Sequence, residues 1–305
     1  MTSDVQNGNY VVYMVHIISY KGQTMTRQEF LKSSVATTVL SMLPTASAAD
    51  NGTKAEIRCE GEYPLHLQGV ATDGKSIFWT FTSVLVKTDL KGRFVSRYEI
   101  NRADGHMGDL CCHDGRVYVS MAMGDKGGCR VGDEVWEFDI ASLLLLKRHP
   151  TPQTVWSNNG IEFYSDSFWV TSSAPKHCRY NMVFRYTPDF KFMRCQMIDS
   201  GWTNRGVQTI FLRNGEIFLG CYGSLDDKMF PHKSCTLVVD GNALADTEGP
   251  SKAPQLVPCE RRVEIGTAEG MLELDGVLMA GRSMRLLPQD KKIQSWSARL
   301  VPVEI

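Results

Sequence analysis

HLQGVATDG, residues 66–74, and SIFWT, residues 76–80, form the stretch from which the fold can be predicted. Two polar residues beside a glycine open the stretch, and a short apolar strand, a tight turn and a second apolar strand follow. Asp-Gly between apolar runs is typical of a two-residue hairpin, because both central positions of that turn need positive φ. The stretch therefore predicts a β-hairpin with a polar opening.

The same pattern occurs four more times along the chain. The glycines beside the five polar openings are Gly69, Gly108, Gly160, Gly206 and Gly270. Three of the later copies repeat the hairpin signal, at Asp114-Gly115, Asn214-Gly215 and Asp275-Gly276, and the third copy has Ser165-Asp166 in that place. A repeat of about 40 to 50 residues is typical of the blades of a propeller. The last interval is the longest, which predicts a loop insertion near Pro231 to Pro258.

Two further apolar runs follow the hairpin in most copies, as in Leu85–Asp89 and Phe94–Ile100 of the first. The last run of the fourth copy is poorly defined around Thr247 to Ala253, and the fifth copy ends in Trp296 to Ile305. Four strands per copy and five copies predict an all-β, five-bladed β-propeller of four-stranded blades. A strand near Ala55 to Glu60 would complete the last blade and close the ring. A β-sandwich has a similar density of strands but no reason to repeat a four-strand motif.

The first 48 residues differ from the repeats and have the pattern of an export signal. A charged segment runs from Met25 to Lys32, a weakly apolar run follows to Leu43, and Ala46-Ser47-Ala48 supplies small residues for cleavage. Residues 26–32 resemble the twin-arginine motif with Gln28 in place of the second arginine, so Tat-like and Sec export both stay open. The alternative is that residues 30–43 form a buried helix. We predict translation from Met25, an extension and signal peptide over residues 1–48, and a periplasmic or secreted propeller over 49–305.

Composition narrows the classes of partner. The chain has 305 residues, and 33 Lys and Arg against 34 Asp and Glu give a formal net charge of -1. Binding of nucleic acid needs a clustered basic face, which this sequence lacks. No long apolar stretch follows the N-terminal region, so we expect no membrane span once the signal is removed. Nine cysteines, an odd number, leave at least one thiol unpaired or paired to another chain. We expect a monomer.

Over residues 55–305 the repeats resemble the broad class of secreted bacterial propellers with YVTN-like or quinoprotein-like blades. A narrower resemblance covers one blade: Pro64 to Gly74, with Phe78-Trp79-Thr80, resembles the first blade of five-bladed glutaminyl cyclases, which opens with a Gln-Gly strand. Later blades of that family carry a Glu-Gly motif, which only Glu269-Gly270 approaches here. The resemblance implies the propeller fold, and the narrower one adds cyclase activity as an alternative.

The polar openings of the repeats predict a functional site. The innermost strand of each blade lines the central channel, so the openings meet at one mouth of that channel. The catalytic residues are predicted to be His66, His106, Asp109 and Glu269, because a histidine near a carboxylate suits a general base at neutral pH. The substrate-binding residues are predicted to be Gln68, Asn158, Asn159, Arg205 and Gln208, since amides bond hydroxyl groups and a guanidinium grips a carboxylate. The structural alternative is that these groups only satisfy strand ends and channel waters.

Three functions stay open. An extracytoplasmic hydrolase, lyase or cyclase acting on a small polar or sugar-like substrate would place His66, His106 and Glu269 in one pocket. A non-catalytic module for a carbohydrate or peptide would line the mouth with amides and aromatic side chains, without a close acid and base. A protein-interaction scaffold would block the channel and work through outer loops.

No cofactor is identified by the sequence, and no spacing motif marks a metal site. Calcium prefers oxygen ligands, and four side chains could supply them: Asp109, Glu162, Glu269 and Gln208.

Overall fold

The computed structural model describes residues 56–126, 129–130, 132–175, 178–229, 231–245, 254–286 and 295–305. The predicted export signal and the alternative helix over residues 30–43 lie outside these ranges. Within them the only α-helix is α1 (Gly241–Ala245). No helix in the described part of the chain is long and apolar enough to cross a membrane.

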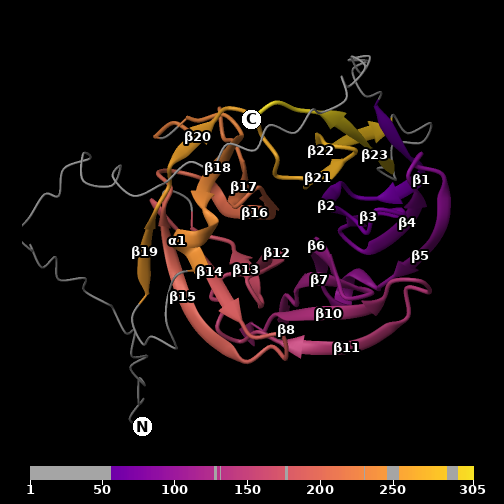
Figure 1. The fold of residues 1–305 in the computed structure, drawn as a ribbon, viewed down its shortest axis with the longest axis horizontal. Helices are drawn as coiled ribbons and strands as arrows, with labels where there is room; N and C mark the ends of the chain where they lie inside the picture. Colours follow the sequence, from indigo (N-terminus) through magenta and orange to yellow (C-terminus); the bar gives the residue numbers. More distant parts are fainter. Residues whose placement is uncertain are drawn as a thin grey trace, which may run out of the picture. The chain divides into compact units, whose positions relative to one another are not determined.

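Five antiparallel sheets surround one axis, which confirms the predicted five-bladed β-propeller (Figure 1). Blade 1 consists of β2 (Leu67–Thr72), β3 (Ser76–Phe81), β4 (Val84–Asp89) and β5 (Phe94–Glu99). Blade 2 consists of β6 (His106–His113), β7 (Arg116–Ala122), β10 (Glu134–Asp139) and β11 (Leu145–Pro150). Blade 3 consists of β12 (Asn158–Tyr164), β13 (Ser167–Ser172), β14 (Tyr180–Tyr186) and β15 (Phe192–Asp199).

Blade 4 consists of β16 (Asn204–Arg213), β17 (Glu216–Tyr222), β18 (Cys235–Asp240) and β20 (Arg261–Val263). Blade 5 consists of β21 (Met271–Leu274), β22 (Val277–Leu286), β23 (Ser295–Pro302) and β1 (Ile57–Pro64). Two short segments lie between the strands of the blades: the 3-10 turn Arg102–Asp104 and the hairpin of β8 (Asp125–Lys126) with β9 (Cys129–Arg130). The innermost strands are β2, β6, β12, β16 and β21, which encircle the axis in Figure 1.

The ring is closed by the first strand of the described chain. β1 pairs antiparallel with β23, with Ile57 opposite Leu300 and Cys59 opposite Ala298. The Ser297 hydroxyl also donates to the Cys59 carbonyl at 2.9 Å. The predicted closing strand is therefore confirmed, with bounds that extend further along the chain than Glu60.

The hairpin signals are confirmed in most of the blades. Positive φ is found at both residues of Asp114-Gly115, Asn214-Gly215, Asp275-Gly276 and Ser165-Asp166. The first copy differs, because Asp73 does not have positive φ and three residues, 73–75, separate β2 from β3. There the Asp73 carboxylate accepts from the backbone amides of Lys75 and Ser76, at 2.9 and 2.7 Å, and so closes a wider turn.

The predicted insertion in the fourth copy is present, but it does not supply that blade's outer strand. The outer strand is β20, after the insertion, and residues 247–253 lie outside the described ranges. Within the insertion, β19 (Gln255–Pro258) pairs parallel with β15 and becomes a fifth strand of blade 3. The Gln196 amide also donates to the Leu244 carbonyl of α1 at 2.5 Å. The insertion therefore ties blade 4 to the outer edge of blade 3.

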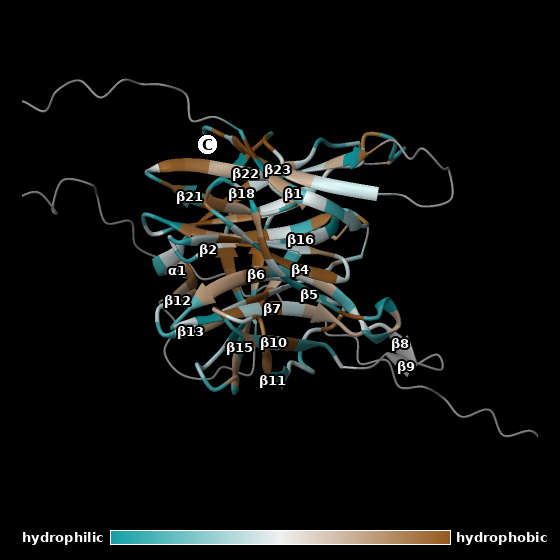
Figure 2. Ribbon diagram, turned by 90° about the vertical axis from the view of Figure 1, so that its right-hand side faces the viewer, coloured by the Kyte–Doolittle hydropathy of each residue, from teal (hydrophilic) through white to brown (hydrophobic). Residues whose placement is uncertain are grey.

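The hydrophobic core lies between the faces of neighbouring blades. Trp79, Trp136 and Trp169 are fully buried, one in each of the first three blades. Trp169 of blade 3 packs in one cluster with Ile210 and Leu219 of blade 4. Figure 2 shows the hydrophobic residues gathered on the strands, with hydrophilic residues at the connecting loops. Burial of apolar side chains between blades, rather than hydrogen bonds alone, holds the sheets together.

Candidate functional site

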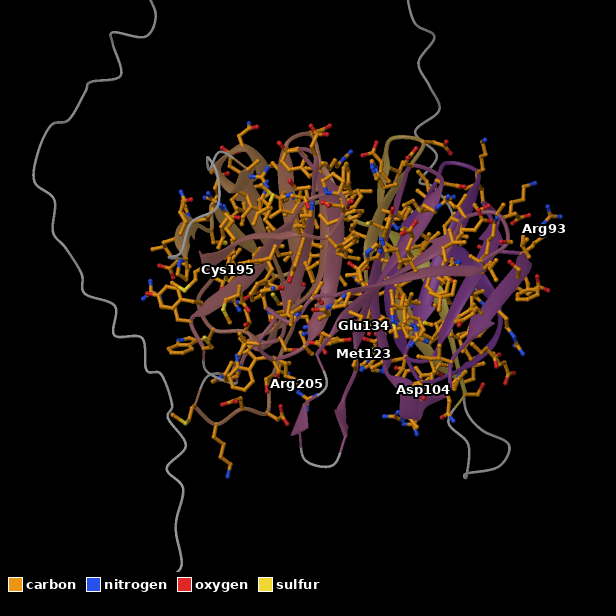
Figure 3. All side chains as sticks on the ribbon, turned by 90° about the horizontal axis from the view of Figure 1, so that it is seen from below. Arg93, Asp104, Met123, Glu134, Cys195 and Arg205 are labelled. Atoms are coloured by element: carbon orange, nitrogen blue, oxygen red, sulfur yellow. The ribbon has the colours of Figure 1, made fainter. Side chains whose placement is uncertain are left out.

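The starts of the inner strands gather at one end of the central channel, which we call the first mouth. A cavity of about 170 Å³ at this mouth is lined by six of the predicted site residues: Gln68, His106, Asn158, Asn159, Arg205 and Gln208. These six residues come from four of the five blades. Figure 3 shows Arg205 on the same face of the propeller as Asp104 and Met123, the face at which β6 begins and β7 ends. The structure thus brings together all five residues predicted to bind substrate.

Asn159 is the centre of a fixed polar network in this cavity. Its amide nitrogen donates to the Ser173 hydroxyl at 3.0 Å and to the Val207 carbonyl of blade 4 at 2.9 Å. Its amide oxygen accepts from the Ser157 hydroxyl at 3.1 Å. The hydroxyl oxygens of Ser157 and Ser173 are hydrogen-bonded to each other at 2.6 Å. The network holds hydroxyl groups at defined positions on the cavity wall. Sequence reasoning missed both serines, although strand pairing beside Asn158 and Ser172 brings them face to face.

Asn158 and Gln208 differ in how much they can offer a ligand. Asn158 is almost completely buried, and its amide nitrogen donates to the Glu134 carbonyl and the Thr151 hydroxyl, at 2.9 and 2.7 Å. Asn158 therefore serves chiefly to anchor the start of β12. Gln208 is half-buried, and its amide nitrogen donates to the Arg205 carbonyl at 3.1 Å. This bond leaves the Gln208 oxygen as an acceptor at the cavity.

Arg205 supplies the free cation of the first mouth. Arg205 has φ of 62° and Gly206 has φ of 81°, and this left-handed pair bends the chain just inside β16. A Cβ atom at Gly206 would lie 2.6 Å from the Ala174 nitrogen, so glycine is required by both its dihedral and its neighbours. Among the described residues, the Arg205 guanidinium makes no hydrogen bond or ion pair. It is exposed and available to an anion.

Both histidines of the first mouth are held in the neutral form. The Gln68 amide nitrogen lies 2.8 Å from His66 Nε2, which acts as the acceptor because an amide nitrogen can only donate. Burial lowers the pKa of His66, while the charge of Glu269 raises it in part. His106 is exposed at the cavity, yet desolvation by the surrounding strands lowers its pKa to about 4, and the neighbouring His66 and the positive charge of Arg102 act in the same direction. At neutral pH His106 is therefore an uncharged base beside the cavity.

Glu269 lies on the same face, in a neighbouring hollow of about 320 Å³ lined also by Tyr222 and Arg282. Ser283 holds its carboxylate through the backbone amide and the hydroxyl, both at 2.6 Å. The Ser283 hydroxyl also accepts from the Leu67 amide at 3.0 Å, which links blade 5 to blade 1 beside His66. Burial raises the pKa of Tyr222, and its hydroxyl, buried in this hollow, has no partner in the described structure.

Asp109 does not line the cavity with His106, contrary to the expectation from the sequence, and His66 does not line it either. The Asp109 side chain is 2% exposed and crosses the axis, where its Oδ2 accepts from the Ile210 amide of blade 4 at 3.0 Å. Burial raises its pKa well above the ordinary value of an aspartate. Asp109 instead closes the waist of the channel beneath the first mouth. The bulge between Met107 and Leu110, which re-aims the side chain, gave no signal in the sequence.

The oxygen ligands considered for calcium are not brought together. Glu269 lies at the first mouth, Asp109 lies in the waist, and Glu162 lines a cavity at the other end of the channel. Across the described ranges, no three side chains of His, Cys, Asp or Glu converge on one point. The eight described cysteines all carry free thiols.

Comparison with known proteins defines the class of the fold. No family model matches the chain, and neither does any curated protein sequence. Among solved structures, the GH43_1 enzyme from Xanthomonas citri complexed with xylose is 11% identical with a TM-score of 0.51, covering 79% of this chain and 89% of its own. The Bacteroides ovatus xyloglucan PUL GH43B is 12% identical with a TM-score of 0.50, covering 82% of this chain and 54% of its own.

The glutaminyl cyclase from Myxococcus xanthus is 12% identical with a TM-score of 0.48, covering 82% of this chain and 98% of its own. Quinoprotein dehydrogenases are also among the matched structures. The propeller fold expected from this resemblance is confirmed by the arrangement of the five sheets. The chain is a five-bladed β-propeller protein, and at this level of identity the likeness defines its architecture alone.

Proposed function

We propose that the first mouth binds a small polar molecule, the size of a single sugar or amino acid, that carries hydroxyl groups and one carboxylate. The observation that supports this is that polar groups from four blades converge on one cavity. Its volume, about 170 Å³, is below the range of about 300 to 1,000 Å³ that is usual for drug-sized ligands. The ligand class follows from the size of the cavity and the chemistry of its walls.

The chemistry of the walls divides the ligand into two parts. Asn159, Ser157 and Ser173 are fixed by one another, so they would meet hydroxyl groups without being ordered first. Arg205 would grip the carboxylate, because a planar guanidinium pairs with both carboxylate oxygens.

Calorimetric titration of the full chain tests this proposal. We expect a hexuronic acid to bind, and a neutral hexose of the same configuration to bind at least tenfold more weakly. Arg205→Met should remove this preference for the acid. Arg93→Met is the matched control, because it removes an exposed arginine from the outer edge of blade 1 (Figure 3) and should leave binding unchanged. Equal affinity for acid and neutral sugar in the parent protein would contradict the role of Arg205.

A second candidate, hydrolase or lyase activity on the same ligand class, is favoured by the position of His106. This neutral imidazole lines the cavity. His66 acts on it from nearby, and Glu269 acts on His66 from the neighbouring hollow. We propose His106 as the general base. Its pKa of about 4 means that the base form is present above that pH, so activity should fall as pH drops through about 4.

Activity and affinity must be measured separately to distinguish catalysis from binding. His106→Asn should lower kcat by about 10²- to 10⁴-fold, the usual contribution of a general base, with a smaller change in KM. A chain that binds the ligand and turns over none of it, at any pH from 4 to 9, is a binding module. The scaffold alternative would use the exposed apolar side chains of the outer loops and β19: Leu225, Met229 and Leu256.

We also propose that this site works outside the cytoplasm, as the signal-like residues 25–48 suggest. N-terminal sequencing of protein recovered from its native host tests this. A mature chain that begins near residue 49 is expected, and one that begins upstream of Met25 contradicts it.

A further inference from the structure

A second cavity lies at the opposite end of the channel, where the inner strands finish. Its volume is about 400 Å³, and β2, β6, β12, β16 and β21 all contribute to its walls. We call this end the second mouth. It shares no lining residue with the first mouth.

The two mouths are separated by a waist in which the inner strands are in close contact. Asp109 crosses this waist and is bonded to the Ile210 amide. A Cβ atom at Gly160 would lie 2.9 Å from that same Ile210 nitrogen, and one at Gly270 would lie 2.5 Å from the Val70 nitrogen. A ligand at one mouth therefore does not reach the groups of the other.

The walls of the second mouth combine polar and apolar surface, with few charged groups. Leu110, Ile210, Leu212 and Met271 contribute apolar surface. Arg213 and Glu273 neutralise each other, because Nε of the arginine lies 2.6 Å from the Glu273 carboxylate. Arg213 is further occupied by a bond from Nη2 to the Gly276 carbonyl at 3.2 Å.

Glu162 is the remaining charged group, and no cation pairs with it among the described residues. Its carboxylate accepts from the Phe163 amide at 2.9 Å and, at a longer 3.4 Å, from the Leu212 amide. Its side chain is partly open to the cavity. Burial of this isolated acid raises its pKa to about 7.

The acid and the two thiols that interact with Glu162 do not supply a counter-charge. Burial raises the pKa values of Asp109 and of the Cys111 and Cys112 thiols, which favours their neutral forms. When Glu162 ionises, the charged groups of this cavity therefore carry one net negative charge. An isolated buried charge is costly unless an opposite charge meets it.

We propose that the second mouth binds a small organic ammonium ion on an apolar body, with Glu162 as its counter-ion. The ammonium would pair with the Glu162 carboxylate, and the apolar body would lie against Leu110, Ile210 and Met271. A metal ion fits less well, because no three ligating side chains converge in the described structure. This site goes beyond the function proposed for the first mouth and does not depend on it.

The pairing makes binding depend on pH in a defined direction. A bound cation stabilises ionised Glu162 and so lowers its pKa, and binding must therefore release a proton wherever the free acid is protonated. Affinity should rise as pH increases towards about 7, by up to tenfold per pH unit, and level off above it.

Calorimetric titration of the full chain with n-propylammonium chloride tests the site. We expect affinity to rise between pH 5.5 and 7.5, with a proton released at the lower pH. Glu162→Gln should weaken binding at least tenfold at pH 8, while Glu99→Gln, an identical change on exposed β5, should leave it unchanged. n-Propanol, which lacks the charge, should bind at least tenfold more weakly. Equal binding of the alcohol, or by Glu162→Gln, would overturn the proposal.

Two further measurements distinguish ammonium binding at the second mouth from an effect on folding and from binding at the first mouth. Carboxyl NMR of Glu162 should show a pKa that falls when the ammonium is added, and an unchanged pKa would count against the pairing. Arg205→Met should bind the ammonium like the parent, whatever it does at the first mouth. Loss of ammonium binding in that variant would overturn the separation of the two mouths.

Discussion

Glycines at the waist decide how closely the inner strands can approach. Gly270 has φ of 100°, and an added Cβ would meet the Val70 nitrogen at 2.5 Å. Gly74 also has positive φ, 80°, but an added Cβ there would meet nothing within 4 Å. Gly270 and Gly74 therefore have the same need for positive φ, but only Gly270 has neighbouring atoms that an added side chain would contact.

We predict that Gly270→Ala is more destabilising than Gly74→Ala. Gly74→Ala should cost about 1 to 2 kcal/mol, the penalty of left-handed backbone for an L-residue. Gly270→Ala should cost a further 1 to 3 kcal/mol or so, because the backbone of blade 1 must move. Urea unfolding of both variants measures the difference, and equal losses would mean that the waist tolerates expansion.

Glu162 makes stability depend on pH. Its pKa of about 7 in the folded chain exceeds the ordinary value of 4.5, so the fold favours the protonated form. The favourable contribution is fully present below about pH 4.5 and is lost as pH rises through about 7. We predict that Glu162→Gln is more stable than the parent by about 1 to 3 kcal/mol at pH 8 and equal to it at pH 4. Denaturant unfolding at both pH values tests this, and an advantage that does not change with pH would contradict it.

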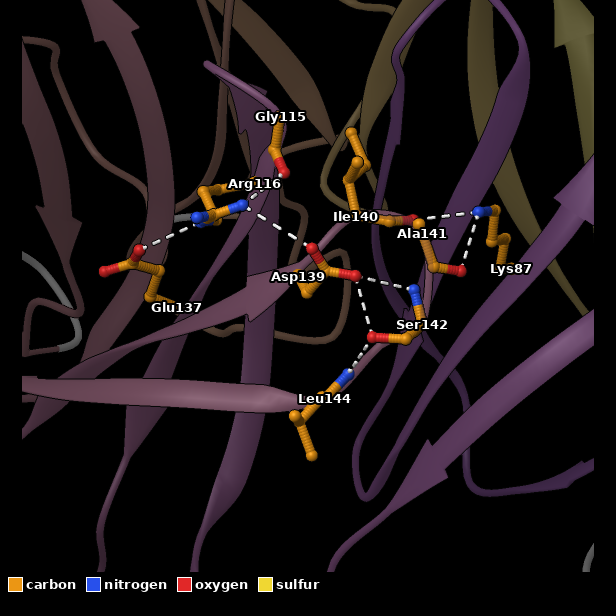
Figure 4. Close-up of polar contacts among 9 residues, drawn as sticks. All are labelled: Lys87, Gly115, Arg116, Glu137, Asp139, Ile140, Ala141, Ser142 and Leu144. Carbon is orange, nitrogen blue, oxygen red and sulfur yellow. Dashed lines mark hydrogen bonds and ion pairs between the residues drawn. The ribbon is translucent and has the colours of Figure 1, made fainter.

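At the scale of elements, the third strand of several blades ends in an aspartate whose carboxylate accepts hydrogen bonds from the turn that follows. Figure 4 shows this arrangement in blade 2, where the Asp139 carboxylate accepts from the Ser142 amide at 2.8 Å and the Ser142 hydroxyl at 2.7 Å. Lys87 of blade 1 donates to the Ile140 carbonyl of the same turn at 2.8 Å. Asp89 and Asp240 occupy the same place in blades 1 and 4 and also accept from backbone amides.

We predict that Asp139→Ala lowers the free energy of unfolding, because the turn amide loses its acceptor. Asp189→Ala is the control, since this acid is exposed and its bonds go to side chains. Asp189→Ala should change the free energy of unfolding much less than Asp139→Ala does. Thermal unfolding separates the two, and similar losses would show that the aspartate does not organise its turn.

At the scale of the whole molecule, closure of the ring joins segments from opposite ends of the described chain. Cys59 and Tyr63 of β1 are buried in the same cluster as Leu300 of β23. Without β1, the edge of β23 would present unpaired backbone groups to solvent.

We predict that Cys59→Pro, which removes a backbone donor from the closing strand, lowers the thermal midpoint by at least 5 °C and promotes self-association. Val95→Pro, on the exposed outer strand of blade 1, should have a smaller effect, because that strand closes no ring. Thermal unfolding and sedimentation velocity measure both outcomes. A larger loss from Val95→Pro would show that closure adds little.

Much of the fold could be predicted because each blade repeats a local signal. Apolar runs and Asn-Gly or Asp-Gly turns are formed by residues that are adjacent in the sequence, so they can be predicted without the structure. The exceptions are non-local. The outer strand of blade 4 follows an insertion, and β19 pairs with blade 3, since edge pairing depends on what lies nearby in space.

The sequence by itself determined the number of blades, the closing strand and the set of amides that meet at the first mouth, because radial repetition turns equal positions into one ring. Only the tertiary structure decided that Asp109 leaves that ring to close the waist and that Glu162 stands without a counter-charge at the far end. The physical reason is that a strand bulge and the burial of a charge are set by contacts between blades, which sequence spacing does not encode.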